Sequence, residues 1–410
     1  MNQSAAKARI GLVVPALELG GGVPAVARFV NDVARRHGFC VKLISLSMDS
    51  RDPQSTRLGM PRTWKDEATV RSGLWQGFAF QHVGAQLGDL EFQRYKPRRA
   101  LTKIVLDCDV LQVVCGSPAW ANTVVGLGIP VALQVAPRVK VERRSLDAWP
   151  LTASGWWRKI MTEIVDRMDD RALSRVDAIQ LMNPSMLDYS QKINLGRADV
   201  DIQYVPPGVD VRLFYPLPAT HPAPAPYILC VGRLDDPRKN IELLLSAFSQ
   251  LPANLSQLQL VTAGASNPPP AYWAQVKAKG LQERVRHIMR PETAELVKLY
   301  QQATVFALSS HEEGLGVVIL EAMACGVPVV ATRCGGPDGI ITDGKDGFLV
   351  PLDDAATMAD RLAVLCSDNK LNRQMGGAAR STIEARYADD VAGAAFVDVW
   401  DKLLKKVGKR

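Results

Sequence analysis

The chain has 410 residues, of which 47% are hydrophobic, 22% charged and 6% aromatic, and its formal net charge is +7. This is the composition of a folded globular protein, and it excludes a disordered chain, a collagen and a disulfide scaffold. At about 150 residues per domain, the length predicts two or three domains. The first 200 residues carry 27 Lys and Arg against 19 Asp and Glu. This excess favours an anionic partner for that half: nucleic acid, a phospholipid surface or a phosphorylated substrate.

Three features bear on the compartment. The seven cysteines are scattered and include no C-x-x-C pair, which indicates reduced thiols in a cytosolic protein. The apolar run from Ile10 to Leu17 is short and is followed by Glu18 and three glycines, which is typical of a first strand and not of a signal peptide. The charge-free stretch from Val110 to Pro137 is interrupted by glycines and prolines, so it predicts two buried strands and no membrane span.

In the first half, apolar runs of strand length alternate with helical patterns, which indicates βαβ units and a parallel sheet. The predicted strands are Arg9–Pro15, Val41–Ser47, Phe78–Val83, Val110–Cys115, Val131–Val135, Ala178–Leu181 and Ile202–Val205. Helices are predicted over Ala25–Arg36 and Trp157–Leu173.

Seven prolines between Pro206 and Pro226 predict an interdomain linker, because this stretch cannot continue a helix or a central strand. The alternation restarts after it, with strands at Tyr227–Gly232, Leu258–Ala263, Val305–Leu308 and Val327–Ala331, and helices at Ile241–Ser249, Glu292–Gln302 and Val317–Ala324. The predicted domains are 1–205, the linker 206–226, 227–385, and a C-terminal helix 386–410 that returns to the first domain. The fold class is therefore α/β, with two Rossmann-like domains whose ligand-binding strand ends face each other across a cleft.

The first candidate for ligand binding is the glycine loop Gly20-Gly21-Gly22, between the first strand and a helix opened by Pro24. Glycines let backbone amides approach a ligand, and a helix N-terminus favours an anion such as phosphate. The loop is not G-x-G-x-x-G, so a nicotinamide dinucleotide site is unsupported. A plain glycine turn remains the alternative.

Two further loops follow strands of the second half. Arg233 and Lys239 flank a turn before a helix, an arrangement that suits a diphosphate; a solvated charged turn is the alternative. Glu313 precedes the turn Gly314-Leu315-Gly316 into the next helix, where it can accept hydrogen bonds from sugar hydroxyls or serve as an N-terminal dipole charge. Glu321 lies eight residues later inside an apolar helix, so we expect it to meet a polar ligand or partner.

The chain resembles the family-4 retaining glycosyltransferases of the GT-B fold, also called glycosyl transferases group 1. Five motifs carry this resemblance: the glycine loop, Val205-Pro206-Pro207-Gly208-Val209-Asp210, Gly232-Arg233 to Lys239-Asn240, the E-x7-E pair Glu313 and Glu321, and Gly335-Gly336 with Asp343 to Val350. They follow the family's order and span most of the chain.

The resemblance implies the site residues. Arg233, Lys239 and Glu313 would be catalytic, with the two cations on the donor diphosphate and Glu313 on the transferred sugar. The implied donor-binding residues are Gly20, Gly21, Gly22, Arg233, Lys239, Glu313, Gly314, Leu315, Gly316, Val317 and Glu321, the last on the ribose hydroxyls. The family works without a metal, so no cofactor is expected besides the nucleotide-sugar co-substrate.

Two glutamines depart from the family pattern. Gln112 and Gln134 stand on first-domain strands where family members often carry His, and Gln134 is the acceptor-side candidate. Glutamine can hydrogen-bond a sugar hydroxyl but cannot take a proton. In the retaining front-face route ascribed to the family, the leaving phosphate itself accepts the acceptor proton.

The acceptor side carries two basic runs, Arg94 to Arg99 and Arg138 to Arg144, the second near Trp149, Trp156, Trp157, Arg158 and Lys159. These residues suit an anionic membrane surface; solvated faces with tryptophans packed in a core are the alternative.

The predicted function is a metal-independent retaining glycosyltransferase. It would move a sugar from a UDP-sugar, favoured over a GDP-sugar, to a glycan or lipid-linked acceptor in bacterial surface polysaccharide or glycolipid synthesis. We expect it in the cytoplasm, peripheral on the inner face of the membrane. The alternative is a nucleotide-sugar-binding or scaffold subunit without turnover. Nucleic acid is not expected as a partner, because no nucleic-acid motif is present.

Overall fold

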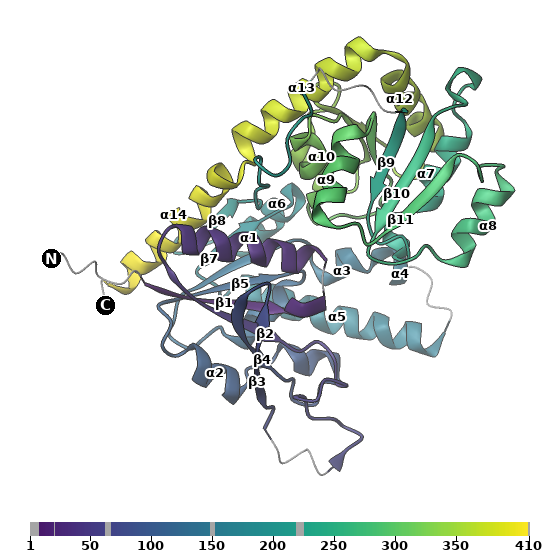
Figure 1. Ribbon diagram of the computed structural model, residues 1–410. Coiled ribbons are helices and arrows are strands. Elements are labelled where there is room, and N and C mark those ends of the chain that lie inside the picture. Colours follow the sequence, from purple (N-terminus) through teal and green to yellow (C-terminus); the bar gives the residue numbers. More distant parts are fainter. Residues whose placement is uncertain (1–7, 20, 62–66, 148–151, 219–224, 409–410) are drawn as a thin grey trace. The chain divides into compact units, whose positions relative to one another are not determined.

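The computed structural model describes residues 8–19, 21–61, 67–147, 152–218 and 225–408 (Figure 1). The chain forms two compact units: unit 1 comprises residues 1–207 and 392–410, and unit 2 comprises residues 208–391. Both are α/β units built on sheets of mainly parallel strands, which confirms the predicted fold class.

In the described part of unit 1, eight strands form one sheet in the order β3-β4-β2-β1-β5-β6-β7-β8. Their bounds are β1 Arg9–Pro15, β2 Cys40–Leu46, β3 Val70–Trp75, β4 Phe78–Val83, β5 Val110–Cys115, β6 Val131–Val135, β7 Ala178–Leu181 and β8 Asp201–Tyr204. β3 pairs antiparallel with β4, and the other neighbouring strands pair in parallel. Every residue of β5, β6 and β7 is buried, because helices cover both faces of a parallel sheet.

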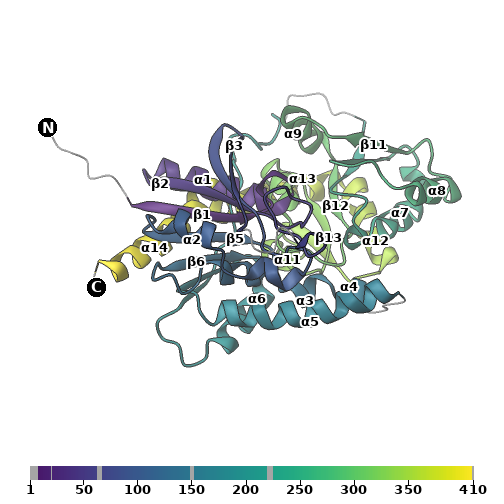
Figure 2. The same cartoon turned by 90° about the horizontal axis from the view of Figure 1, so that it is seen from below.

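The helices of unit 1 are α1 Gly22–Arg36, α2 Arg99–Val105, α3 Val139–Glu142, α4 Arg144–Asp147, α5 Ala153–Leu173, α6 Pro184–Ile193 and most of α14, Asp389–Val407. One face of the sheet packs against α2, α5 and α6 in a continuous apolar core (Figure 2). Leu111 and Val113 of β5 belong to that core, whereas Gln112 between them points to the opposite face. There Trp400 of α14 donates a hydrogen bond to Gln112 Oε1 over 2.7 Å. The predicted return of the C-terminal helix to the first domain is thus confirmed.

Within residues 225–391, six parallel strands form the sheet of unit 2 in the order β11-β10-β9-β12-β13-β14. Their bounds are β9 Tyr227–Val231, β10 Gln259–Gly264, β11 Val285–Met289, β12 Val305–Leu308, β13 Val329–Thr332 and β14 Gly347–Val350. The helices are α7 Ile241–Ser249, α8 Pro270–Ala278, α9 Thr293–Gln302, α10 Val317–Ala324, α11 Gly336–Ile340, α12 Ala355–Ser367 and α13 Asn369–Arg386. β9 and β12, neighbours in this sheet, are followed by the two loops that hold Arg233, Lys239 and Glu313.

The proline-rich stretch begins at the boundary between the units, which falls after Pro207. From Gly208 onward its described residues are part of unit 2. Val209 pairs with Ala388 as an isolated bridge, and Phe214 packs edge-on against Tyr300 at 5.9 Å. The chain crosses back after Val391, inside α14. Residues 208–218 of the predicted linker are therefore part of unit 2.

Candidate functional site

The core of the candidate site is formed by two loops at the carboxyl ends of β9 and β12. Hydrogen bonds join the loops directly: Ser309 Oγ donates to the carbonyl of Lys239 over 2.9 Å, and the His311 amide donates to the carbonyl of Arg238 over 2.8 Å. Because β9 and β12 are adjacent and parallel, residues that are about 70 positions apart in the sequence meet at one edge of the sheet.

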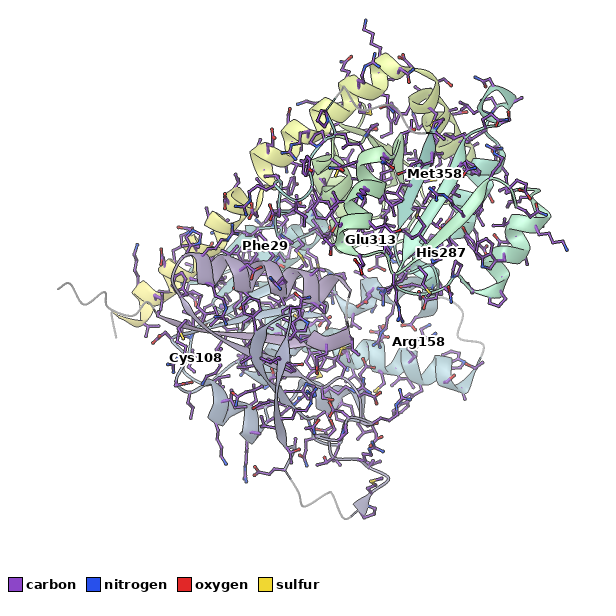
Figure 3. All side chains as sticks on the ribbon, viewed as in Figure 1. Phe29, Cys108, Arg158, His287, Glu313 and Met358 are labelled. Carbon is purple, nitrogen blue, oxygen red and sulfur yellow. The ribbon has the colours of Figure 1, made fainter. Side chains whose placement is uncertain are left out.

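Lys239 and Glu313 form an ion pair at this edge, with 2.5 Å between Nζ and Oε1. Ser310 Oγ donates to the same carboxylate oxygen over 2.7 Å. The two paired side chains are 22% and 11% exposed, so the pair is shielded but still reached by solvent. The structure thus brings together the cation predicted for the diphosphate and the carboxylate predicted for the sugar (Figure 3 labels Glu313).

The turn after Glu313 is shaped by glycines. Gly316 has φ +89°, a left-handed conformation that side chains rarely adopt, and it directly precedes α10. Gly336 lies so close to this turn that a Cβ would fall 2.4 Å from the carbonyl oxygen of Leu315. Its amide donates to the carbonyl of Glu313 over 3.0 Å. Gly314, Leu315, Gly316 and Val317 are therefore held at the N-terminal end of α10, where backbone amides and the helix dipole favour an anion.

Glu321 has a partner inside unit 2. Tyr300 Oη donates a hydrogen bond to Glu321 Oε2 over 2.7 Å, and the Tyr300 side chain is fully buried. Burial raises the pKa of Glu321 to about 7, although the hydrogen bond from Tyr300 acts in the opposite direction. The partner that the sequence led us to expect is thus found on α9.

Arg233 contacts a different group from Lys239. Its side chain is 55% exposed, and a guanidinium nitrogen lies 3.0 Å from Asp236 Oδ2. Arg238 binds the same carboxylate at 2.8 Å. Burial acts to raise the pKa of Asp236, but the hydrogen bonds and charge of Arg238 outweigh it and hold that pKa below its ordinary value. Arg233 is therefore fixed at the surface of the turn by an ionised Asp236.

The glycine loop belongs to unit 1. Gly20 lies outside the described residues. Gly21 has φ +99° and caps α1, which begins at Gly22, and a Cβ at either position would meet nothing within 4 Å. The backbone conformation, and not crowding, therefore requires glycine at residue 21.

Gln112 and Gln134 both lie inside the sheet of unit 1, and each is fully buried. Gln112 accepts the hydrogen bond from Trp400, and Gln134 Nε2 donates to the carbonyl of Val205 over 3.1 Å. The acceptor-side role expected of Gln134 stays a prediction, and its buried Oε1 has no hydrogen-bond partner among the described residues. Its side chain is held within the sheet, because the alternation of β6 directs it into the protein interior.

Three residues near the site, Asn240, His311 and Asp353, were given no role from the sequence. Asn240, in a left-handed conformation with φ 43°, joins the turn to α7. Its Nδ2 lies 2.9 Å from His311 Nε2 and 3.0 Å from Asp353 Oδ1, and His311 Nε2 lies 2.7 Å from the same Asp353 oxygen. The signal was present, since an Asn before a helix tolerates the left-handed region. The contact with Asp353, however, depends on the tertiary fold.

The basic runs of unit 1 are only partly surface features. Arg98 is buried and donates to the carbonyls of Val83 and Gly84. Arg138 is 14% exposed and pairs with Asp166 at 2.7 Å. The prediction that each run forms a basic surface is therefore wrong at these positions. By contrast, Trp156 and Trp157 on α5 are 57% and 52% exposed, which rules out core packing for them, and Trp149 lies outside the described residues.

Neither a metal cluster nor a membrane-spanning helix is found among the described residues. No three His, Cys, Asp or Glu side chains there are grouped so that they could hold an ion. No helix in that part of the chain combines the length and apolarity needed to cross a bilayer.

Residues 218–382 match the sequence model of the family described as Glycosyl transferases group 1. This region falls within unit 2. The chain is 32% identical over 232 residues to a D-inositol 3-phosphate glycosyltransferase of Xylanimonas cellulosilytica, over 52% of this chain and 54% of the relative. It is 35% identical over 150 residues to a probable sucrose-phosphate synthase of Thermosipho melanesiensis, over 36% of each chain. The chain thus spans about half the length, or less, of these curated relatives.

Solved structures match nearly the whole chain. The sucrose-phosphate synthase of Thermosynechococcus elongatus superposes with a TM-score of 0.71 and 20% identity, covering 98% of this chain and 100% of that one. Anabaena HepE in complex with UDP-glucose superposes with a TM-score of 0.69 and 14% identity, covering 96% and 100%. At these identities the likeness is one of fold.

Proposed function

We propose that the chain is a group 1 glycosyltransferase that transfers a sugar from a nucleotide-diphosphate donor to a glycan or lipid-linked acceptor, because residues 218–382 match that family and the chain has the GT-B fold. The observation that carries this proposal is the Lys239–Glu313 ion pair beside the N-terminus of α10. One cation, one carboxylate and a set of backbone amides are the groups needed to bind a diphosphate next to a sugar.

On donor binding, Lys239 and Glu313 would separate and each would contact a different part of the donor. The diphosphate takes Lys239 and Arg233 as counter-charges, while Glu313 accepts hydrogen bonds from hydroxyls of the transferred sugar. These cations neutralise the negative charge that grows on the leaving diphosphate, so we propose a reaction without a metal. Ser310, which donates to Glu313, keeps that carboxylate in place as Lys239 turns to phosphate.

The proposed reaction retains the configuration at the anomeric carbon. The bond from this carbon to the diphosphate oxygen breaks with its electron pair, and the acceptor oxygen forms the new bond on the same face. The acceptor proton passes to the leaving phosphate oxygen, so no side-chain base is required. This route suits a chain that carries Gln112 and Gln134 on β5 and β6, because a glutamine amide cannot take a proton.

Glu321 is proposed to bind the ribose hydroxyls with the carboxylate that Tyr300 orients. UDP is proposed over GDP as the nucleotide, supported by the structural neighbours solved with UDP or UDP-glucose. The all-thiol state of the seven cysteines, each at a described position, supports action in the cytoplasm. The proposed role is in bacterial surface polysaccharide or glycolipid synthesis.

A phosphorylated acceptor is a second candidate for the acceptor class. The curated relatives named above act, by their names, in inositol phosphate and sucrose phosphate chemistry. The excess positive charge of the first 200 residues favours the same kind of acceptor.

The test is donor binding followed by turnover. Calorimetry with UDP-sugars and GDP-sugars should give binding to at least one donor, weakened in the Lys239→Ala variant. Mass spectrometry with lipid-linked, glycan and sugar-phosphate acceptors should then show transfer. Failure of every donor to bind would exclude the proposal, and binding without hydrolysis or transfer would identify the alternative, a binding subunit.

A further inference from the structure

Helix α5 presents an unusual stripe to solvent. Its buried residues face the sheet, and they are Gly155, Met161, Thr162, Val165, Asp166, Asp169, Ala172 and Leu173. The opposite side, called here the α5 face, is formed by Trp156, Trp157, Ile160, Glu163, Arg167 and Arg171. Positions 156, 160, 167 and 171 are separated by 4, 7 and 4 residues, so they align along one side of the helix.

Large apolar side chains dominate the first two turns of this face. Trp156, Trp157 and Ile160 are 57%, 52% and 51% exposed. Single exposed apolar residues are ordinary, but three adjacent ones form a contiguous patch, and such patches mark interaction sites. The Lys159 ammonium lies 5.6 Å from the centre of the Trp156 ring, so a cation accompanies the aromatic cluster.

The rest of the face is positively charged. Arg167 and Arg171 are exposed on the following turns. Glu163 lies within the stripe, between Ile160 and Arg167, and binds Lys140 at 2.8 Å. Asp170 lies at the edge of the stripe, 3.2 Å from Arg138. The net charge that the α5 face offers to a partner is therefore positive.

We propose that the α5 face is a docking surface for an anionic phospholipid bilayer. Tryptophan rings prefer the headgroup level of a membrane, and Ile160 between them would reach the acyl boundary. The arginines would bind lipid phosphates along a stripe of about 22 Å from Trp156 to Arg171, at 1.5 Å per residue. In Figure 2, α5 lies along the lower edge of unit 1, beside α6.

A tryptophan platform for a soluble glycan is the competing use of this face. Stacking on a sugar ring requires one or two aromatic faces, and it gives no role to the exposed Ile160 or to the arginines, which lie about three and four turns away from the tryptophans. A bilayer would contact both tryptophans, Ile160 and both arginines, and the positive charge of the stripe favours an anionic lipid. The proposal requires no sugar transfer, so it stands independently of the proposed function.

The experiment is co-sedimentation of the full chain with vesicles of phosphatidylcholine alone or mixed with phosphatidylglycerol, at low and high salt. Trp156→Ala/Trp157→Ala removes the aromatic part and Arg167→Gln/Arg171→Gln removes the charge. Trp273→Ala is the matched control, because Trp273 is another exposed tryptophan, at 41%, on α8 of unit 2. Melting temperatures establish that each variant is folded.

The wild-type protein should bind the mixed vesicles and lose binding at high salt. The tryptophan variant should bind at least about tenfold more weakly. Each arginine removed should weaken binding about fivefold and reduce the preference for phosphatidylglycerol. Three results would overturn the proposal: no binding of the wild-type protein to mixed vesicles, an equal loss in the Trp273→Ala control, or binding of a soluble glycan that depends on Trp156 and Trp157 without lipid binding. Donor binding measured on the same variants keeps a failure of this proposal distinct from a failure of the proposed function.

Discussion

The hydroxyl of Tyr300 donates a hydrogen bond to Glu321, and this contact ties α9 to α10 within unit 2. Phe214 and Phe306 pack against the ring of Tyr300, at 5.9 and 5.7 Å between centroids, so the hydroxyl has little freedom to turn away. Glu321 therefore has a fixed partner inside unit 2, Tyr300, and a proposed partner in the ligand, the donor ribose.

Replacing Glu321 separates these two roles. Glu321→Gln keeps the shape but weakens an acceptor at the ribose, so it should raise the donor KM by a factor corresponding to about 1–3 kcal/mol. Tyr300→Phe removes only the internal hydrogen bond and should mainly lower the melting temperature. Donor kinetics and melting curves on both variants check this. An unchanged donor KM in Glu321→Gln would exclude ribose binding and show that the residue has only a structural role.

The stability of the protein should depend on pH through Glu321. Its pKa is about 7 in the folded protein, above the ordinary 4.5, so the native state favours the protonated form. The contribution of this residue to the free energy of unfolding is therefore greatest below about pH 4.5 and falls as the pH rises toward about 7. The difference between wild-type protein and Glu321→Gln, measured by chemical denaturation across that range, isolates the effect. A difference independent of pH would contradict the raised pKa.

Lys239→Ala should depress kcat more than it weakens donor binding, because negative charge grows on the diphosphate as the glycosidic bond breaks. We expect a loss in kcat of about 10²–10³-fold. Lys239→Arg keeps the charge and should restore part of the activity. Equal losses in kcat and donor affinity on a steady-state assay would instead assign Lys239 to ground-state binding.

Asp169 should be essential to the stability of unit 1. Its Oδ1 accepts hydrogen bonds from Ser117 Oγ and the Ala119 amide, at 2.5 and 2.7 Å, and its Oδ2 accepts from the Val139 amide at 2.8 Å. Asp169→Asn replaces one acceptor by a donor, which should cost about 1–3 kcal/mol of unfolding free energy. Urea denaturation measures this cost, and a neutral result would show that the amide finds other partners.

Because Gly336 lies so close to Leu315, we expect the addition of a single methyl group at residue 336 to reduce donor affinity. Gly336→Ala should displace the turn after Glu313 and reduce donor affinity, because the clashing atom is a backbone oxygen. Gly377→Ala is the matched control: it lies in α13 with nothing within 4 Å of the added carbon, so it should stabilise the helix by about 0.5–1 kcal/mol. Equal effects of the two substitutions on donor affinity would be inconsistent with the contact.

The central strands could be read from the sequence because they are continuous apolar runs. The bounds expected for β1, β4, β5, β6, β7 and β12 agree with the structure. β3 was not predicted: it is an edge strand with exposed residues at alternate positions and a glycine within it. β11 and β14 were also missed, since polar residues interrupt the first and the second begins with a glycine directly after a charged loop.

The site was predictable to the extent that its chemistry lies in local motifs. Glu313 and Lys239 were identified as residue types beside strand ends, but their mutual contact needs β9 and β12 to be neighbours. Tyr300 and Asp353 lie on other elements, so no local pattern connects them to the site. The burial of Gln134 could not be read from the sequence, because the sequence shows the strand but not which of its side chains the fold encloses.

The contact between Trp400 and Gln112 spans 288 positions of the chain. A ribosome releases β5 long before α14, and all of unit 2 is synthesised between them. The part of the unit 1 sheet that α14 covers therefore stays uncovered until α14 is synthesised, whereas unit 2 by then has every segment that it needs to fold. Completion of the first unit therefore comes after the synthesis of unit 2, and a chain stalled before residue 400 would expose the apolar surface on which quality-control proteases and chaperones act.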